Sequence, residues 1–144
     1  MILLFIIITF LQSGFDKITD WNGNIGWLTG HFSKTFLARQ VPLMVATILI
    51  LEVLTGILAI IGIVQLIAGG ETLIALYACV LAAIVLLMLL FGQRVAKDYA
   101  GAFTITGYFV VAILGVYILS QIKNRSRLTV RCFNASYSVN LLRQ

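Results

Sequence analysis

The chain has 144 residues, of which 61% are hydrophobic and only 10% are charged, and its mean hydropathy is +1.07. Soluble globular proteins are about 45–50% apolar and about 25% charged, so this chain has too few polar side chains to cover a water-exposed surface. The composition therefore indicates a protein of the lipid bilayer. One histidine and two cysteines, Cys79 and Cys132, exclude a bis-histidine haem, a dithiol redox site and a Cys/His zinc site within one chain.

The net charge of +5 comes entirely from the C-terminal tail. Residues 1–122 contain five basic and five acidic side chains, whereas residues 123–144 contain five basic side chains and no acidic one. The basic residues of the tail are Lys123, Arg125, Arg127, Arg131 and Arg143. A basic cluster directly after an apolar stretch is typical of an anchor at the lipid headgroups, so we expect no nucleic-acid partner.

Four apolar stretches predict four transmembrane helices, at about residues 1–19, 41–68, 72–92 and 99–122. A helix needs about 20 residues to cross a hydrocarbon core of about 30 Å. The first stretch lacks the basic start of a secretory signal peptide, so we expect a retained helix. Short connections after the second and third spans predict antiparallel neighbours, and therefore an all-α, up-down-up-down bundle over residues 1–122.

The connection between the first two spans is long and rich in aromatic residues. Ile25, Leu28, Phe32 and Phe36 recur at spacings of three and four, which predicts a short helix with an apolar stripe. Such a helix would lie in the headgroup plane as an interfacial segment, or would fold back as a lid over the end of the bundle. His31, on the same segment, could exchange protons or bind a quinone carbonyl, or could be a polar group of the interface.

Glu52 is an acidic side chain inside the second predicted span. It lies ten residues after Pro42, which places it about 15 Å into the membrane at about 1.5 Å per residue. An ionised carboxylate at that depth costs several kcal/mol, so Glu52 must face the bundle interior and be protonated, hydrogen-bonded or paired with a cation. The functional interpretations are a proton acceptor, a ligand-binding carboxylate or half of an ion pair. The structural alternative is a protonated acid that joins two helices by a hydrogen bond.

A second polar group closes the first span. Gln12 and Asp16 are four residues apart, so we expect them to share a helix face beside Lys17. They are expected at the same membrane surface as Arg94 and Asp98, either as a shared polar mouth or as separate solvated helix ends. No catalytic or metal-binding residue is predicted. The candidate ligand-binding or proton-accepting residues are Glu52, Asp16, Lys17, Gln12, His31, Arg94 and Asp98.

Small residues in the spans predict close contacts between helices, because a missing side chain lets two backbones approach. Thr55 and Ala59 follow Glu52 at helical spacing and support an interior position for it. The glycines that we predict to lie at helix contacts are Gly14, Gly56, Gly62, Gly107 and Gly115.

The count of basic residues does not decide the orientation of the bundle, because five are predicted on each side of the membrane. Those opposite the tail are Lys17, Lys34, Arg39, Arg94 and Lys97. We place the tail in the cytoplasm because its basic residues crowd the membrane end. Further along, Leu128, Val130 and Cys132 alternate with polar residues as in a strand, but a lone strand is unstable, so we expect disorder or a partner chain there.

Two short motifs, taken in order, resemble the DoxX family of small four-span bacterial membrane proteins. Gly14 and Lys17 match the Gly-x-x-Lys element at the end of the first helix of that family. Glu52, Gly56 and Gly62 match its Glu-x-x-x-Gly…Gly element in the second helix. The resemblance covers the four spans, although the first helix begins late, and the end of the tail matches no part of the family.

The resemblance implies a protein of the bacterial cytoplasmic membrane with an accessory, non-catalytic role in a quinone-linked oxidoreductase complex. The family is named for a subunit associated with a quinol oxidase and with thiosulfate:quinone oxidoreductase. The implied partners are lipid, other redox subunits or a second copy of the chain, and the implied ligand is a quinone, with no cofactor held by the chain itself. Two alternatives stay open: a solute or proton-coupled carrier that uses Glu52, and a membrane scaffold held by its glycine-lined helix faces.

Overall fold

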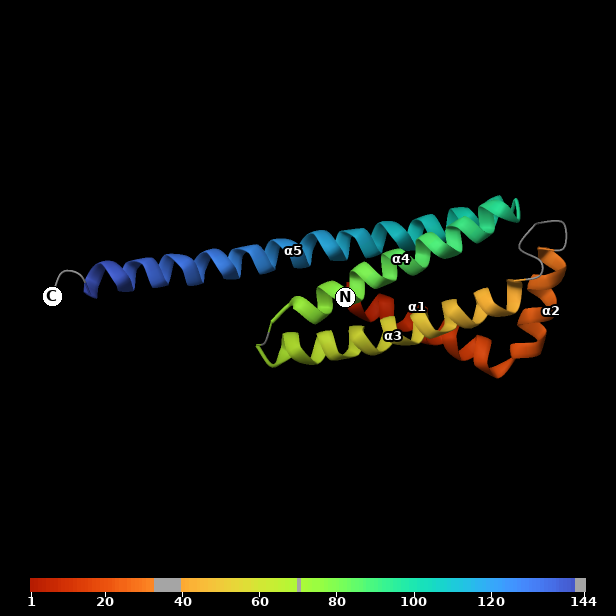
Figure 1. Ribbon diagram of the computed structural model, residues 1–144, viewed down its shortest axis with the longest axis horizontal. Coiled ribbons are helices and arrows are strands. Elements are labelled where there is room, and N and C mark those ends of the chain that lie inside the picture. The colour runs from red at the N-terminus through yellow and green to blue at the C-terminus, as the bar shows by residue number, and fades with distance from the viewer. Residues whose placement is uncertain (33–39, 70, 142–144) are drawn as a thin grey trace.

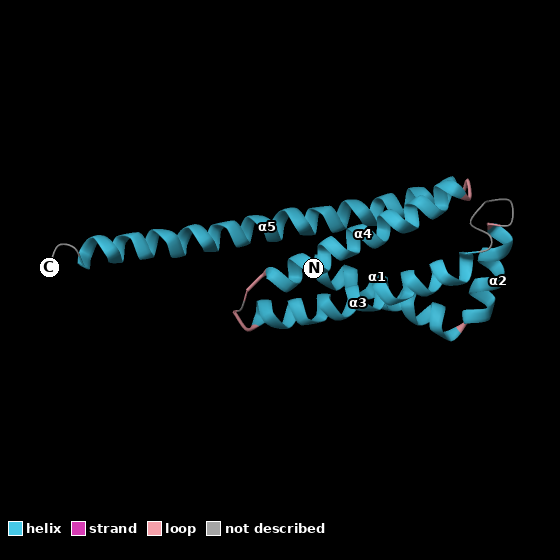
Figure 2. Ribbon diagram, viewed as in Figure 1, coloured by secondary structure: helices cyan, strands magenta, loops and turns pink. Residues whose placement is uncertain are grey.

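The computed structural model describes residues 1–32, 40–69 and 71–141, and within these ranges it consists of helices without any strand (Figures 1 and 2). The helices are α1 (Ile2–Thr19), α2 (Trp21–His31), α3 (Val41–Ile67), α4 (Leu73–Val95) and α5 (Tyr99–Leu141). Within the described ranges, four segments are long and apolar enough to cross a membrane, namely α1, α3, α4 and Tyr99–Arg125 of α5. The predicted all-helical class with four candidate spans is confirmed.

The long helices pack in a bundle in which α3 and α4 are the central pair. α1 packs mainly on α3, α3 on α4, and α4 on α5, and the last part of α5 projects beyond the bundle (Figure 1). α3 ends at a turn where Gly69 has a φ of +71°, a conformation that glycine adopts without strain. Phe5 of α1 and Tyr108 of α5 stack edge to face, with ring centroids 5.6 Å apart, and so link the outer helices.

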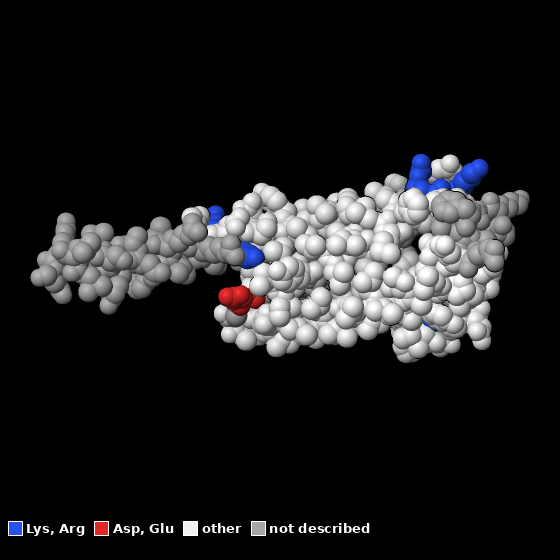
Figure 3. Space-filling view, in the orientation of Figure 1, with Lys and Arg blue, Asp and Glu red and all other residues white. Residues whose placement is uncertain are grey.

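The core of the bundle is built from small side chains. Ala75, Ala78, Cys79 and Ala82 of α4 are fully buried, and they contact large residues such as Ile6 of α1 within one apolar cluster. Many large apolar side chains point outward instead. On the face drawn in Figure 3, charged side chains appear toward the two ends of the bundle, with an uncharged surface between them. An apolar exterior between charged ends suits a hydrocarbon environment.

Four of the five glycines expected at helix contacts lie against a neighbouring helix. A Cβ on Gly62 would come within 2.8 Å of the Ala75 backbone, and one on Gly115 within 2.8 Å of the Cys79 sulfur. Gly56 lies directly under Leu11, and Gly14 faces α3 at ordinary contact distance. Gly107 differs, because it is exposed and has nothing within 4 Å of a Cβ position. Eight residues at about 100° each rotate it about 80° from Gly115, so the two glycines do not face the same neighbour.

α2 covers one end of the bundle. Its Leu28, and Phe32 at its C-terminal cap, pack with Val41 and Val45 of α3 and with Val95 at the end of α4. Phe36, the last residue of the predicted stripe, lies outside the described residues, as do Lys34 and Arg39.

The C-terminal tail is the largest difference from expectation. Residues 123–141 continue α5 without a break, whereas the alternation at Leu128, Val130 and Cys132 indicated neither a helix nor stable structure. A helix that is already formed extends at low cost because its nucleus has been made in the membrane span. The partner chain expected on this segment stays a prediction.

Candidate functional site

A compact polar cluster lies between α1 and α3. The Lys17 Nζ is 3.0 Å from Glu52 Oε2 and 3.1 Å from Oε1, so the ammonium group donates to both oxygens of the carboxylate. Ser13 Oγ donates to Glu52 Oε1 at 3.1 Å and accepts from Lys17 Nζ at 2.6 Å. Lys17 Nζ also lies 3.4 Å from the Ser13 carbonyl oxygen. The three side chains therefore form a closed network.

Helical spacing explains why these three residues meet. Ser13 and Lys17 are four residues apart on α1, so both side chains leave the helix on the same face, toward α3. Glu52 lies on the buried stripe of α3, between Val45 and Thr55. Gly14, the next residue after Ser13, is buried and faces Val53 and Leu49 of α3 at ordinary contact distance.

The pairing removes the main cost of placing Glu52 inside the bundle. Its side chain is 1% exposed, and that of Lys17 is 17% exposed. An uncompensated charge at such a position is strongly unfavourable, whereas a hydrogen-bonded pair satisfies both charges. Among the interpretations left open by the sequence, the geometry selects the ion pair, with Lys17 as the cation. The Thr55 hydroxyl, one turn along α3, donates a hydrogen bond of 2.7 Å to the Leu51 carbonyl of its own helix.

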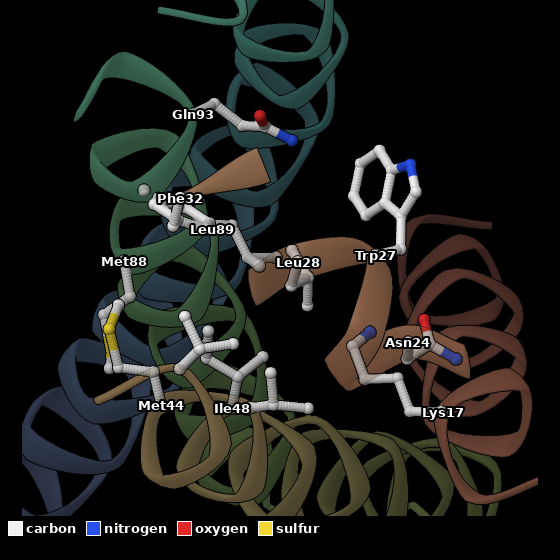
Figure 4. A pocket seen from close by; sticks show the side chains of 13 residues that line it. Lys17, Asn24, Trp27, Leu28, Phe32, Met44, Ile48, Met88, Leu89 and Gln93 are labelled. Carbon is white, nitrogen blue, oxygen red and sulfur yellow. The ribbon is translucent and has the colours of Figure 1, made fainter. Parts of the chain in front are cut away.

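A cavity of about 260 Å³ lies beside this network, beneath α2 (Figure 4). Four helices contribute to its wall. The polar side chains on it are Lys17 of α1, Asn24 of α2 and Gln93 of α4, and Figure 4 shows Gln93 across the cavity from the other two. The rest of the wall is mainly apolar and comprises Trp27, Leu28, Phe32, Val41, Met44, Val45, Ile48, Met88, Leu89 and Gly92.

This arrangement suits an apolar ligand that carries oxygen acceptors. An ammonium group has three N–H donors, and Lys17 Nζ already contacts Ser13 Oγ and both Glu52 oxygens. A ligand oxygen would therefore bind Lys17 by replacing one of these contacts, and the Ser13 hydroxyl is the uncharged one. Amide side chains such as Asn24 and Gln93 donate and accept. Ligand sites commonly combine an apolar wall with a few polar groups, as this cavity does.

The other candidate residues of the first span do not join the network. Gln12 and Asp16 share a helix face as expected, but that face is exposed and is rotated by about 100° from the face of Ser13 and Lys17.

The candidate residues near the connection between α4 and α5 make local contacts. The guanidinium carbon of Arg94 lies over the ring of Tyr99, 5.0 Å from the ring centroid. Asp98 accepts a hydrogen bond from the Gly101 N–H at 3.0 Å and so caps α5. These contacts lie at the ends of α4 and α5, and the polar mouth that Arg94 and Asp98 are expected to share with the end of the first span stays a prediction.

His31 is the last residue of α2, and its expected role stays a prediction. Sequence reasoning did not assign a role to Ser13, Asn24 or Gln93. The four-residue spacing of Ser13 and Lys17 was a usable signal for Ser13, whereas Asn24 and Gln93 reach the cavity only through the packing of α2 and α4.

Within the described part of the chain, no group of three or more His, Cys, Asp or Glu side chains could hold a metal ion. No protein-family model, curated protein or solved structure matches the chain. The polar cluster and the cavity are therefore the features of the described chain that bear on its function.

Proposed function

We propose that this protein is an accessory, non-catalytic subunit of a quinone-linked oxidoreductase complex of the bacterial cytoplasmic membrane. Its four spans form an up-down-up-down bundle, α2 lies at the membrane interface, and the C-terminal tail is cytoplasmic. The proposal combines the resemblance of the Gly14–Lys17 and Glu52–Gly62 motifs to the DoxX family with the geometry of the site.

The observation that carries the proposal is Lys17, which is paired with Glu52 and lies at the wall of an apolar cavity. A quinone headgroup is a flat, apolar ring with carbonyl oxygens, and it needs hydrogen-bond donors set into an apolar wall. Gln93 offers an amide donor on one side of the cavity, Lys17 lies on the other side and would donate once its contact with Ser13 is replaced, and Trp27 and Phe32 offer aromatic surface. In this role Glu52 keeps the Lys17 ammonium group charged and oriented, while Lys17 exchanges its contact with the Ser13 hydroxyl for one with the ligand.

The carrier alternative is less well supported. A carrier that binds a cation through Glu52 needs at least one free carboxylate oxygen. Both oxygens of Glu52 accept hydrogen bonds from Lys17, and Oε1 also accepts one from Ser13. The carboxylate is therefore already neutralised by a residue of the same chain.

Affinity purification from native membranes tests the proposal. We expect the tagged full chain to co-purify with subunits of an oxidoreductase. We also expect the purified protein, in lipid nanodiscs, to bind a short-chain benzoquinone, measured by quenching of tryptophan fluorescence. Recovery of the chain without redox subunits, together with quenching equal to that of an indole-containing membrane peptide, would overturn the proposal. Solute uptake by liposomes that contain the protein would instead support the carrier.

A further inference from the structure

A second hollow adjoins the cavity on the outside of the bundle. It is a groove of about 450 Å³ between α3 and α4. Met44, Ile48 and Met88 line both the groove and the cavity. The two hollows therefore share part of their walls.

The groove faces the region where the hydrocarbon of the bilayer would lie. Its outer residues include Leu43, Ile84, Leu87 and Phe91, all apolar and all exposed. They lie within α3 and α4, two of the helices long and apolar enough to cross a membrane. A water-soluble ligand gains nothing from such a surface, whereas a hydrocarbon chain fits it.

We infer that the groove holds the hydrocarbon tail of a membrane-dissolved ligand whose polar headgroup occupies the cavity beside Lys17, and that the ligand enters sideways from the bilayer between Met44 and Met88. The inference deepens the proposed function and rests on it, since the groove has this role only if the cavity binds a ligand. The continuity of the two hollows through three shared residues is what identifies the occupant as one molecule with a polar end and an apolar end.

The shared residues are suited to a passage that opens. Methionine is unbranched and flexible, so its side chain changes rotamer without movement of the helix. Met88 is 38% exposed, and Met44 is half-buried. Figure 4 shows Met44 and Met88 side by side at the edge of the cavity away from Lys17. Rotation of the two side chains would join the groove to the cavity and leave the ion pair in place.

The test compares two probes with the same headgroup, a benzoquinone without a tail and one with a decyl chain. Binding to the full chain in nanodiscs is measured by tryptophan quenching, with concentrations corrected for partitioning into protein-free nanodiscs. Ile84 lines the groove but not the cavity, so Ile84→Trp fills the groove and changes no residue of the cavity lining. Ile113→Trp is the matched control, because Ile113 of α5 is 44% exposed and Ile84 is 47% exposed. We expect Ile84→Trp to weaken the decyl probe about tenfold and to leave the tailless probe unchanged. Ile113→Trp should change neither.

The outcomes separate this inference from the proposed function. If neither probe binds the unmodified protein, the proposed function fails and the inference fails with it. If both probes bind and Ile84→Trp affects them equally or not at all, ligand binding stands and the groove inference is overturned. A decyl probe with a photoreactive diazirine at the end of its tail gives an answer even if Ile84→Trp does not fold. Labelling of residues 43–48 and 84–91 supports the inference, and labelling confined to other segments contradicts it.

Discussion

The two ends of the α3–α4 pair differ in how closely the two helices pack. Near the connecting turn, Gly62 and Ala75 bring the two backbones so close that a Cβ on Gly62 would lie 2.8 Å from the Ala75 Cα. Near α2, the same two helices carry Met44, Ile48, Met88 and Leu89 and leave a cavity between them. At one end small residues let the two helices touch, and at the other end large residues surround a cavity.

The difference shows which part of the bundle serves stability and which part has room for a ligand. Close contacts between helices gain van der Waals attraction, the main source of helix association in a bilayer. A cavity gives up such contacts, and a buried ion pair adds little net stability compared with apolar side chains of similar size. The end that has both features is therefore the one at which we propose that a ligand binds.

The largest expected effect comes from breaking the ion pair on one side only. Lys17→Met or Glu52→Met alone leaves one buried charge without a partner, and each should cost about 3 kcal/mol in the free energy of unfolding. The double variant Lys17→Met/Glu52→Met removes both charges and should recover most of that loss. Thermal unfolding in detergent measures all four proteins. Additive losses in the double variant would mean that the two side chains do not form a pair.

The next largest effect should come from the closed end. Gly62→Ala places a Cβ against the Ala75 backbone, so α3 and α4 must separate at a cost of about 1–3 kcal/mol. Gly107→Ala is the matched control, because its Cβ meets nothing within 4 Å, and it should be neutral or stabilising by up to about 1 kcal/mol. Unfolding in the same detergent checks both variants. Equal stability of the two would contradict the close contact at Gly62.

A smaller effect is expected from the hydroxyl group that completes the network. Ser13→Ala removes one hydrogen bond to Glu52 and one from Lys17 but leaves the ion pair, so it should cost about 1–2 kcal/mol. Ser120→Ala is the control, because the hydroxyl of Ser120 donates to the Tyr117 carbonyl of its own helix. If Ser13→Ala is no more destabilising than Ser120→Ala, Ser13 does not hold the pair.

The smallest effect on stability is expected from changes to Gln12 and Asp16, each of which directly precedes a residue of the network. Gln12→Ala and Asp16→Asn change exposed side chains and should shift the free energy of unfolding by less than about 0.5 kcal/mol. Neither variant should weaken binding of the benzoquinone probe. A loss of binding in Asp16→Asn comparable with that in a Lys17 variant would support the shared polar mouth that the sequence suggested.

The four candidate spans were predictable from the sequence to within a few residues. Apolar length alone specifies them: the stretch at residues 41–68 became Val41–Ile67, and that at residues 72–92 became Leu73–Val95. The interior position of Glu52 was also predictable from the sequence, because a carboxylate within an apolar span is too costly to face lipid.

The details of the site could not be obtained in this way. Lys17 was grouped with Asp16, its neighbour in sequence, although the decisive spacing is the four residues that separate Ser13 from Lys17. The cavity depends on how far α3 and α4 separate and on where α2 packs, and neither is encoded in a local pattern. The short alternation after residue 127 was also misleading, because three alternating residues carry less weight than a helix that is already formed.

The most direct test of the account is the affinity of the benzoquinone probe for the Lys17→Met/Glu52→Met protein in nanodiscs, once its unfolding curve has confirmed that it is folded. If the pair serves binding, the affinity should fall at least about tenfold, since the ligand oxygen loses a charged donor. An unchanged affinity in the folded double variant would contradict the account and leave the pair as a structural link between α1 and α3.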